Sequence, residues 1–221
     1  MNEHFTGSFT QQEPIPDTAI DAAVAVLKSG RLHRYNTGPD EAGEVALLEQ
    51  EFAAEMDAKY CLAVASGGYA MTTALRAIGV KPGDRVLTNA FTLAPVPGAI
   101  AAVGAVPVFV GVTEDLVIDL DDLAAKADQA DVLLLSHMRG HICDMDRLLA
   151  LCGATDIKII EDCSQAHGAE IQGKKVGTFA DFSAYSCYPT KNLGGTGDGG
   201  VILCRSKEFS EKIKSFGWNC T

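Results

Sequence analysis

Short, unbroken apolar runs alternate with segments of helical spacing along most of this chain. Apolar runs of about four to eight residues are typical of strands that are buried on both faces of a parallel sheet. We therefore expect strands at residues 60–65, 85–88, 106–112, 131–136, 158–162, 182–186 and 201–204. Strands that alternate with helices in this way predict an α/β fold, a three-layer sandwich in which helices cover both faces of a mainly parallel sheet.

The segments between these runs predict the helices. Residues 44–56 are an example, because Val45, Leu48, Phe52 and Met56 fall on one helical face. Residues 1–16 are polar and indicate an extended arm, whereas residues 31–43 indicate an exposed loop. Further helices are expected at residues 19–29, 69–78, 95–103, 123–127, 144–152 and 206–216.

Composition narrows the class of protein. The chain has 221 residues, 47% hydrophobic and 21% charged, which is ordinary for a soluble globular protein. Its net charge of -11 argues against a nucleic-acid partner or an anionic membrane, since both favour a basic face. No apolar run is long enough to span a bilayer, and the first residues lack the features of a signal peptide. The seven cysteines are scattered without a CxxC pair, so we expect reduced thiols in a cytoplasmic protein.

One lysine has an unusual setting, between a Pro-Thr turn and a glycine-rich loop. Lys191 follows Tyr188-Pro189-Thr190 and precedes the glycines of residues 194–200. Most lysines are solvated at the protein surface. A lysine drawn into an apolar site loses its proton more readily, and its neutral amine becomes a nucleophile that can form a Schiff base. Our hypothesis is therefore that Lys191 carries pyridoxal phosphate (PLP).

Other polar residues at strand ends support this hypothesis. Asp162 ends an expected strand; such an aspartate is often only a cap, but it can also hold the protonated pyridine nitrogen of PLP. Ser66-Gly67-Gly68 lies between a strand and a helix, where free backbone N–H groups can bind phosphate, although a tight turn is the alternative interpretation. Ser186 offers a further hydroxyl for the phosphate group.

Two other patterns suggest different chemistry. The segment Gly195–Gly200 matches the GxGxxG fingerprint, but that fingerprint needs a strand before it and a helix after it. Here a strand follows, so we reject dinucleotide binding. A second pattern, His137, His141, Cys143 and Asp144, resembles a metal cluster, but Gly140 interrupts the helical spacing that the two histidines would need. We expect no metal, and a loop that shapes the substrate pocket.

Together these motifs resemble the aspartate-aminotransferase fold, which is fold type I of PLP enzymes, and more closely the DegT/StrS family of sugar aminotransferases. The most specific segments are Glu161–Gly168 and Pro189-Thr190-Lys191-Asn192. Other matching segments follow in family order, from residue 30 onward: Asn36-Thr37-Gly38-Pro39, Ala65-Ser66-Gly67, Gly83-Asp84, Gly104-Ala105-Val106-Pro107-Val108 and Asp144-Met145-Asp146.

The resemblance implies roles for the matched residues. Lys191 would be the Schiff-base lysine, Asp162 would pair with the pyridinium nitrogen, and Gln165 would lie near the cofactor ring and its hydroxyl. The phosphate would be held by Ser66, Gly67 and Ser186.

Two positions depart from the family pattern. Gly68 stands where the family usually has a threonine, so one phosphate hydroxyl is missing. Leu93 stands where the family has an aromatic residue that stacks on the pyridine ring, so either Leu93 packs on the ring or Phe91 replaces it.

The family's activity sets the functional expectation. The chain would be the large domain of a PLP-dependent aminotransferase that moves an amino group from an amino acid donor to a keto acceptor, expected to be a nucleotide-linked sugar. Lys191 separates it from the related dehydratases, which lack this lysine. A homodimer is expected, with the loop at residues 31–43 reaching across to the second subunit.

We expect residues 1–30 to form an arm and a helix, and residues 31–221 the PLP-binding large domain. Family members continue into a small C-terminal domain, which we expect to be absent from this chain. Either a separate chain supplies that domain, or this protein is a reduced form. Two alternatives remain open. The chain could be a PLP-binding partner or assembly subunit with little activity alone, or a PLP enzyme acting on a non-sugar amine or amino acid.

Overall fold

The computed structural model describes residues 14–34, 38 and 41–218, and the chain divides into two compact units, residues 1–46 and 47–221. In the first unit, the predicted helix is α1 (Asp17–Ser29), and it ends where Gly30 takes a left-handed conformation, with φ of 69°. All residues of α1 are described, and none of them is buried. The predicted arm lies mostly outside the described residues, and the predicted boundary at residue 30 stays a prediction.

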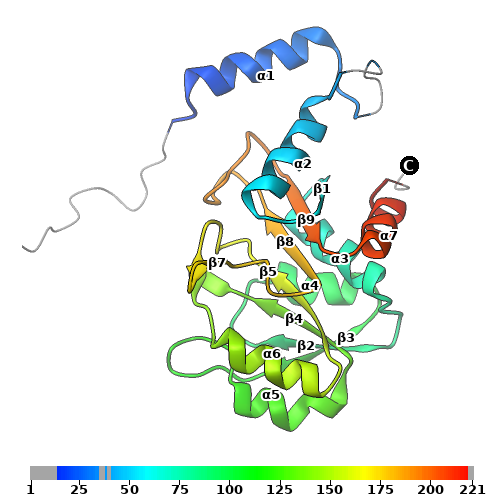
Figure 1. Cartoon of the computed structure of the whole chain (residues 1–221), viewed down its shortest axis with the longest axis vertical. Coiled ribbons are helices and arrows are strands. Elements are labelled where there is room, and N and C mark those ends of the chain that lie inside the picture. Colours follow the sequence, from blue (N-terminus) through cyan, green and yellow to red (C-terminus); the bar gives the residue numbers. More distant parts are fainter. Residues whose placement is uncertain (1–13, 35–37, 39–40, 219–221) are drawn as a thin grey trace, which may run out of the picture. The chain divides into compact units, whose positions relative to one another are not determined.

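A seven-stranded sheet organises the second unit, and its strand order is β1-β9-β8-β5-β4-β2-β3 (Figure 1). Of the described strands in this sheet, β9 alone runs in the direction opposite to the others, so the predicted mainly parallel sheet is confirmed. The strands are β1 (Tyr60–Val64), β2 (Arg85–Asn89), β3 (Val106–Val110), β4 (Val132–Ser136), β5 (Lys158–Asp162), β8 (Phe182–Ser186) and β9 (Gly200–Cys204).

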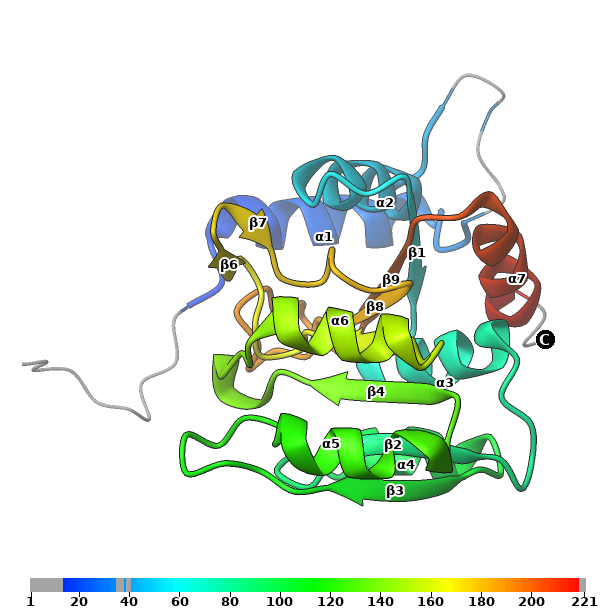
Figure 2. The same cartoon turned by 60° about the horizontal axis from the view of Figure 1, so that its bottom comes forward.

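Helices cover both faces of this sheet, as the three-layer prediction requires. The helices are α2 (Glu44–Glu55), α3 (Gly67–Ile78), α4 (Pro95–Ala102), α5 (Leu120–Lys126), α6 (Met145–Ala154) and α7 (Lys207–Trp218), with short 3-10 turns η1 (Ala127–Gln129) and η2 (Met138–Gly140). Buried residues of α3, α4 and α7 pack on one face of the sheet, and those of α5 and α6 pack on the other. Figure 2 shows α5 and α6 in front of the strands.

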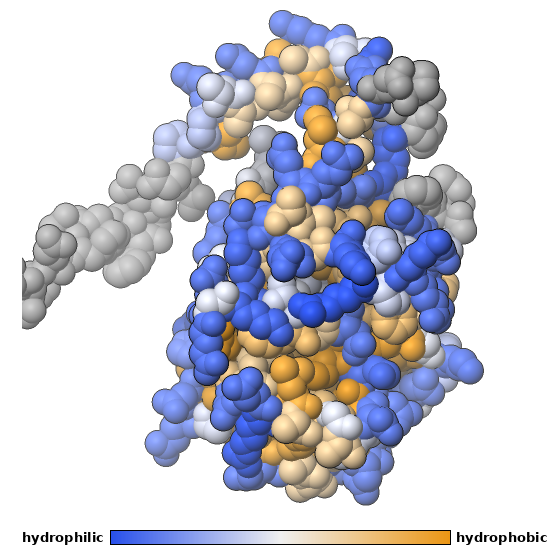
Figure 3. All heavy atoms as spheres, in the orientation of Figure 1, coloured by the Kyte–Doolittle hydropathy of each residue, from blue (hydrophilic) through white to orange (hydrophobic). Residues whose placement is uncertain are grey.

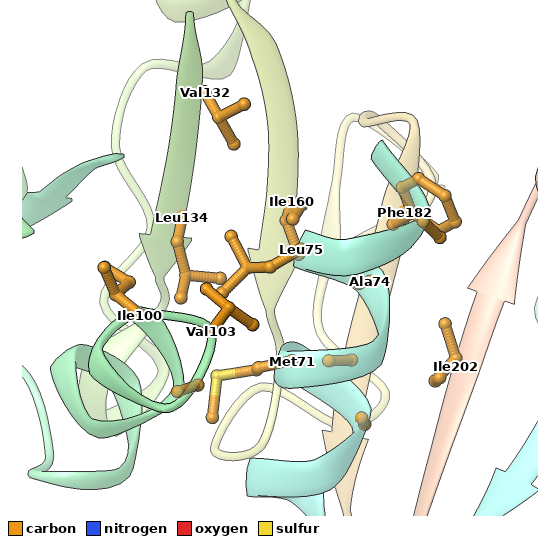
Figure 4. Packing of buried hydrophobic residues seen from close by; sticks show 14 of the residues in the cluster. Met71, Ala74, Leu75, Ile100, Val103, Val132, Leu134, Ile160, Phe182 and Ile202 are labelled. Atoms are coloured by element: carbon orange, nitrogen blue, oxygen red, sulfur yellow. The ribbon is translucent and has the colours of Figure 1, made fainter. Parts of the chain in front are cut away.

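The alternation of side chains along each strand explains why the apolar runs are continuous. Leu134 of β4 and Ile160 of β5 point toward α3 and α4, where Leu75 and Ile100 meet them (Figure 4). The neighbouring residue Leu133 belongs to the cluster on the opposite face. Because both faces are covered, such a strand is apolar at nearly every position.

Three local details differ from the sequence prediction. The helix predicted at 123–127 begins at Leu120, because the Asp119 carboxylate accepts the N–H groups of Asp121 and Asp122 at 2.9 and 3.2 Å. The strand predicted at 106–112 ends at Val110. A short hairpin of β6 (Glu170–Ile171) and β7 (Lys174–Lys175) was not predicted.

The surface and the cysteines agree with the composition. Figure 3 shows polar residues over much of the visible face, with apolar residues between them. Among the described cysteines, Cys143, Cys152, Cys163, Cys187 and Cys204 are free thiols. Cys220 lies outside the described residues. Among the helices of that same part, none has both the length and the apolar character to cross a membrane.

Candidate functional site

A cavity of about 350 Å³ opens where α3 begins and where the carboxyl ends of β5 and β8 meet. In a sheet of this kind, ligands bind beyond the carboxyl ends of the strands. Of the residues predicted for the site, all except Gln165 line this cavity: Ser66, Gly67, Gly68, Leu93, Asp162, Ser186 and Lys191. A cavity of similar size, about 360 Å³, lies elsewhere, beside Leu149 and Arg205, and contains none of them. The chemistry therefore points to the first cavity.

Asp162 forms the acidic floor of the cavity. It ends β5, and its side chain is buried. The Ser136 hydroxyl donates to its Oδ2 at 3.0 Å, while Ser164 donates to its Oδ1 through both its hydroxyl, at 2.6 Å, and its backbone N–H, at 3.1 Å. Three donors on two oxygens hold the carboxylate in one orientation. Such a carboxylate can keep a nearby ring nitrogen protonated.

The start of α3 forms the opposite side of the cavity and has the chemistry of a phosphate site. Ser66 caps this helix, its hydroxyl oxygen accepting the Tyr69 N–H at 3.1 Å. The helix begins at Gly67, two residues earlier than predicted, so Gly67 and Gly68 belong to its first turn. Backbone N–H groups of a first turn have no acceptor within the helix and point outward along its axis, where they can bind an anion.

Close backbone contacts explain the glycines around this seat. A Cβ atom on Gly67 would lie 2.6 Å from the Cβ of Ser186, and one on Gly200 would lie 2.6 Å from the backbone carbon of Ser66. Only glycine permits both approaches. They bring the Ser186 hydroxyl next to the helix start, so that Ser66 and Ser186 flank the free N–H groups. A phosphate group fits this set of donors.

Lys191 lies in the loop that joins β8 to β9 and reaches the same cavity. It is half-buried, and its backbone N–H donates to the Tyr188 carbonyl at 2.8 Å. A Cβ on Gly194 would lie 2.7 Å from the Pro189 carbonyl oxygen, so this loop also requires a glycine to turn. The strand β9 follows the glycines directly, in agreement with the argument against a dinucleotide fingerprint.

Two residues near Asp162 have supporting positions. Gln165 is half-buried outside the lining, and its side-chain oxygen accepts the Arg139 N–H at 2.8 Å. The Nε2–H of His167 donates to the Ser186 carbonyl at 3.0 Å. Burial lowers the pKa of His167, and the nearby positive charge of Lys191 acts in the same direction, while the Ser186 bond opposes both. A neutral His167 therefore holds Ser186 in place.

Leu93 and Phe91, the two candidates for the wall over the expected cofactor ring, differ in their position relative to the cavity. Leu93 lines the cavity and is 40% exposed, whereas Phe91 is half-buried and is not part of the lining. The carbonyl of Phe91 accepts a hydrogen bond from Asn89 at 2.9 Å. An aliphatic side chain therefore forms this wall.

The pattern that resembled a metal cluster does not come together. His137 is buried and His141 is exposed, while Asp144 caps α6 by accepting the Arg147 N–H at 3.0 Å. Burial raises the pKa of Cys143 to about 12, which disfavours the thiolate that a metal needs. Among the described residues a different group is close together and buried, consisting of His137, Glu161 and Cys163.

This buried group is a hydrogen-bond centre on the face of β5 opposite to Asp162. The Glu161 carboxylate accepts the N–H groups of Gly177, Phe179 and Ala180 at 2.9 to 3.0 Å, and the Nε2–H of His137 at 3.1 Å. These four donors occupy the carboxylate, and burial raises the pKa of the Cys163 thiol well above its usual range. The group is thus poorly suited to a metal.

Sequence reasoning missed Asn89, Ser136 and Ser164. Each comes at or just after a strand end, which is the signal that could have identified them. The partners of Asn89 and Ser136 lie on other strands, so the strand order is needed to find them, whereas Ser164 bonds to Asp162 two residues before it.

The chain is similar to known aminotransferases. It is 39% identical over 198 residues to the dTDP-3-amino-3,4,6-trideoxy-alpha-D-glucose transaminase of Streptomyces venezuelae. The aligned region covers 88% of this chain and 50% of that relative. The aminotransferase of Psychrobacter cryohalolentis superposes with a TM-score of 0.87 and 31% identity, over 95% of this chain and 52% of that one. NtdA of Bacillus subtilis, solved with bound cofactor PMP, gives a TM-score of 0.79 and 26% identity, over 91% and 44%.

The chain therefore spans about half the length of the curated relatives it matches. A family model for the DegT/DnrJ/EryC1/StrS aminotransferases matches residues 15–219, which is most of the sequence. The resemblance inferred from the sequence motifs is confirmed, and the chain belongs to the DegT/DnrJ/EryC1/StrS aminotransferase family.

Proposed function

We propose that this chain is the cofactor-binding part of a PLP-dependent aminotransferase. One observation carries the proposal: the Lys191 amine, the Asp162 carboxylate and the phosphate seat at the start of α3 all line a single cavity. An amine that can bind an aldehyde, an acid for a ring nitrogen and donors for a phosphate match the three reactive parts of PLP.

Each residue has a task in this proposal. Lys191 would hold the cofactor through its side-chain amine, and the same amine, when free, would take up and release the proton of the amino donor's α-carbon. Asp162, fixed by Ser136 and Ser164, keeps the ring nitrogen protonated. When bound, PLP supplies an electron sink for the charge that develops when the α-proton leaves.

The remaining walls hold and cover the cofactor. Ser66, Gly67, Gly68 and Ser186 take the phosphate, and Leu93 supplies an apolar wall for the ring. Gln165, with its side-chain oxygen bonded to Arg139, keeps an amide N–H₂ group for the ring hydroxyl.

The substrates follow from the relatives. The S. venezuelae relative is named as a transaminase of a dTDP-linked amino sugar. We propose a nucleotide-linked keto sugar as acceptor and an amino acid as donor. The free thiols of Cys143, Cys152, Cys163, Cys187 and Cys204 support a reducing, cytoplasmic location.

A complete active site would need parts beyond the residues of this chain. The chain spans about half of its relatives, so a small C-terminal domain, on this chain's own continuation or on another chain, would close the substrate pocket. We further propose a homodimer as the active assembly.

An absorbance titration with PLP tests the proposal. A lysine-bound pyridoxal cofactor absorbs in the visible, so the wild-type chain should develop a band on addition of PLP. Lys191→Ala should abolish this band. Lys59→Ala, which removes the exposed lysine directly before β1, should keep it. A wild-type chain without a band would refute cofactor binding.

Addition of glutamate separates the proposal from the assembly-subunit alternative. A change of the band to the shorter wavelength of the aminated cofactor shows a half-reaction and supports an aminotransferase. A stable band without this change would favour a PLP-binding assembly subunit.

A further inference from the structure

Asn89 is a buried amide at the end of β2, and its side chain makes three hydrogen bonds to backbone groups. Its exposed fraction is 1%. Its Oδ1 accepts the Ser136 N–H at 2.9 Å, and its Nδ2 donates to the Ser136 carbonyl at 3.1 Å. The second hydrogen of Nδ2 goes to the Phe91 carbonyl at 2.9 Å. Both donor hydrogens and the oxygen of the amide are thus engaged, which gives the side chain one defined orientation.

The place of Asn89 in the sheet gives these bonds their importance. The backbone register between β2 and β4 ends at Thr88 and Leu134, and the Asn89 side chain then takes over as the partner of Ser136. After β2 the chain crosses through α4 to β3; after β4 it crosses through α6, on the other face, to β5. Figure 2 shows β2 and β4, which are neighbours in the sheet. Such reversals of strand order open the crevice in which α/β proteins bind ligands.

On one side of Asn89 lies the acidic floor of the cavity. Ser136 is the residue whose backbone Asn89 holds, and the Ser136 hydroxyl donates to Asp162 at 3.0 Å. All three residues are buried. The direction in which the Ser136 hydroxyl points therefore depends on the two bonds that Asn89 makes to the Ser136 backbone.

On the other side lies the apolar wall. The bond to the Phe91 carbonyl fixes the segment that leads directly to Leu93, which lines the cavity. The Asn89 amide thus holds Phe91, two positions before Leu93, and also Ser136, whose hydroxyl bonds to Asp162.

We propose that Asn89 is a positioning residue that sets the spacing between the Leu93 wall and the Asp162 floor, and so the width of the slot for the cofactor ring. This inference rests on the proposed function for its chemical meaning. The mechanical coupling between the two segments, however, is a property of the ligand-free chain and is tested without PLP.

Hydrogen exchange on the ligand-free chain tests the coupling. In Asn89→Ala, backbone hydrogen exchange should accelerate both in residues 90–94 and in residues 136–140. The expected acceleration is about tenfold, because each segment loses the local stabilisation of about one hydrogen bond. Asn89→Asp keeps the acceptor for Ser136 but loses both donated bonds, and should show the same pair of changes. The matched control is Thr88→Val, because Thr88 is equally buried on the same strand and its hydroxyl has no hydrogen-bond partner among the described residues. Acceleration confined to one segment, or shared by the control, would overturn the coupling.

A PLP titration by visible absorbance tests the consequence for the slot. The Kd for PLP should rise about tenfold in Asn89→Ala and stay unchanged in Thr88→Val. Because part of the effect passes through the Ser136 hydroxyl, Asn89→Ala should cost less affinity in a Ser136→Ala background than in the wild type. Equal affinities of wild type and Asn89→Ala, or strictly additive effects in the double variant, would refute the positioning role. If the wild type itself does not bind PLP, the proposed function fails, and hydrogen exchange alone then decides whether Asn89 couples the two segments.

Discussion

Replacement of Glu161 by glutamine should destabilise the fold far more than an ordinary loss of one charge. The Glu161 side chain is fully buried, and its carboxylate is the common acceptor for three backbone N–H groups of residues 177–180 and for His137. Glutamine has nearly the same shape but only one acceptor oxygen. That oxygen can keep Phe179 and Ala180, while the new N–H₂ group faces the Gly177 N–H.

The magnitude follows from the donors that lose their acceptor. A buried N–H left unpaired costs about 1–3 kcal/mol, and hydrogen bonds to a neutral oxygen are about 1 kcal/mol weaker than bonds to a charged one. Glu161→Gln should therefore lower the free energy of unfolding by about 2–4 kcal/mol. Glu161→Ala removes every acceptor and should cost about 3–5 kcal/mol, as for other broken buried pairs. Either loss is a large part of the roughly 5–15 kcal/mol that stabilises a typical domain.

Urea unfolding followed by circular dichroism measures these losses. The control is Glu170→Gln, which removes an exposed carboxylate from β6 and should stay within about 0.5 kcal/mol of the wild type. If Glu161→Gln also falls within that range, the carboxylate does not hold residues 177–180, and the reasoning from its four donors is wrong.

Two further predictions concern stability. Gly177→Ala should lower the melting temperature strongly, because its Cβ would lie 1.8 Å from the Tyr185 hydroxyl oxygen and the backbone has φ of 92°. Gly153→Ala in α6, where a Cβ meets no atom within 4 Å, should instead raise the free energy of unfolding by up to about 1 kcal/mol. A higher melting temperature for Gly177→Ala than for Gly153→Ala would contradict this reasoning. Because burial lowers the pKa of His167 below its usual 6.5, the unfolded chain binds a proton that the folded chain resists, so the stability from this residue is complete above that pH and is lost as the pH falls. His167→Gln should flatten this dependence between pH 7 and pH 5 in urea titrations, and an unchanged slope would exclude His167 as its source.

Much of the fold was predictable because the sheet is buried on both faces. A run such as Val132–Ser136 is apolar at nearly every position, which identifies a strand without any knowledge of its neighbours. Asp162 and Ser66 were predictable for a related reason, since a polar residue directly after such a run lies at the sheet edge where ligands bind.

The supporting residues could not be predicted, because their meaning lies in pairings across the sheet. Asn89 and Ser136 are far apart in sequence and meet only because β2 and β4 are neighbours. The same holds for Glu161, whose charge in the middle of an apolar strand has no sequence-local partner. Periodicity identifies strands but does not give their order, so it cannot assign these contacts.

The single antiparallel strand also has a consequence for the order in which the chain can assemble. Among the described strands, β9 is the only sheet neighbour of β1, and their register joins Tyr60 to Cys204 across most of the chain. During synthesis β1 therefore cannot pair with the sheet until nearly all later strands have been made. Closing so long a loop is entropically costly and slow. Gly200 packs against Ser66 at this same junction. The proposed phosphate seat should thus be among the last parts of the molecule to form, so that binding of the proposed cofactor would report completed folding.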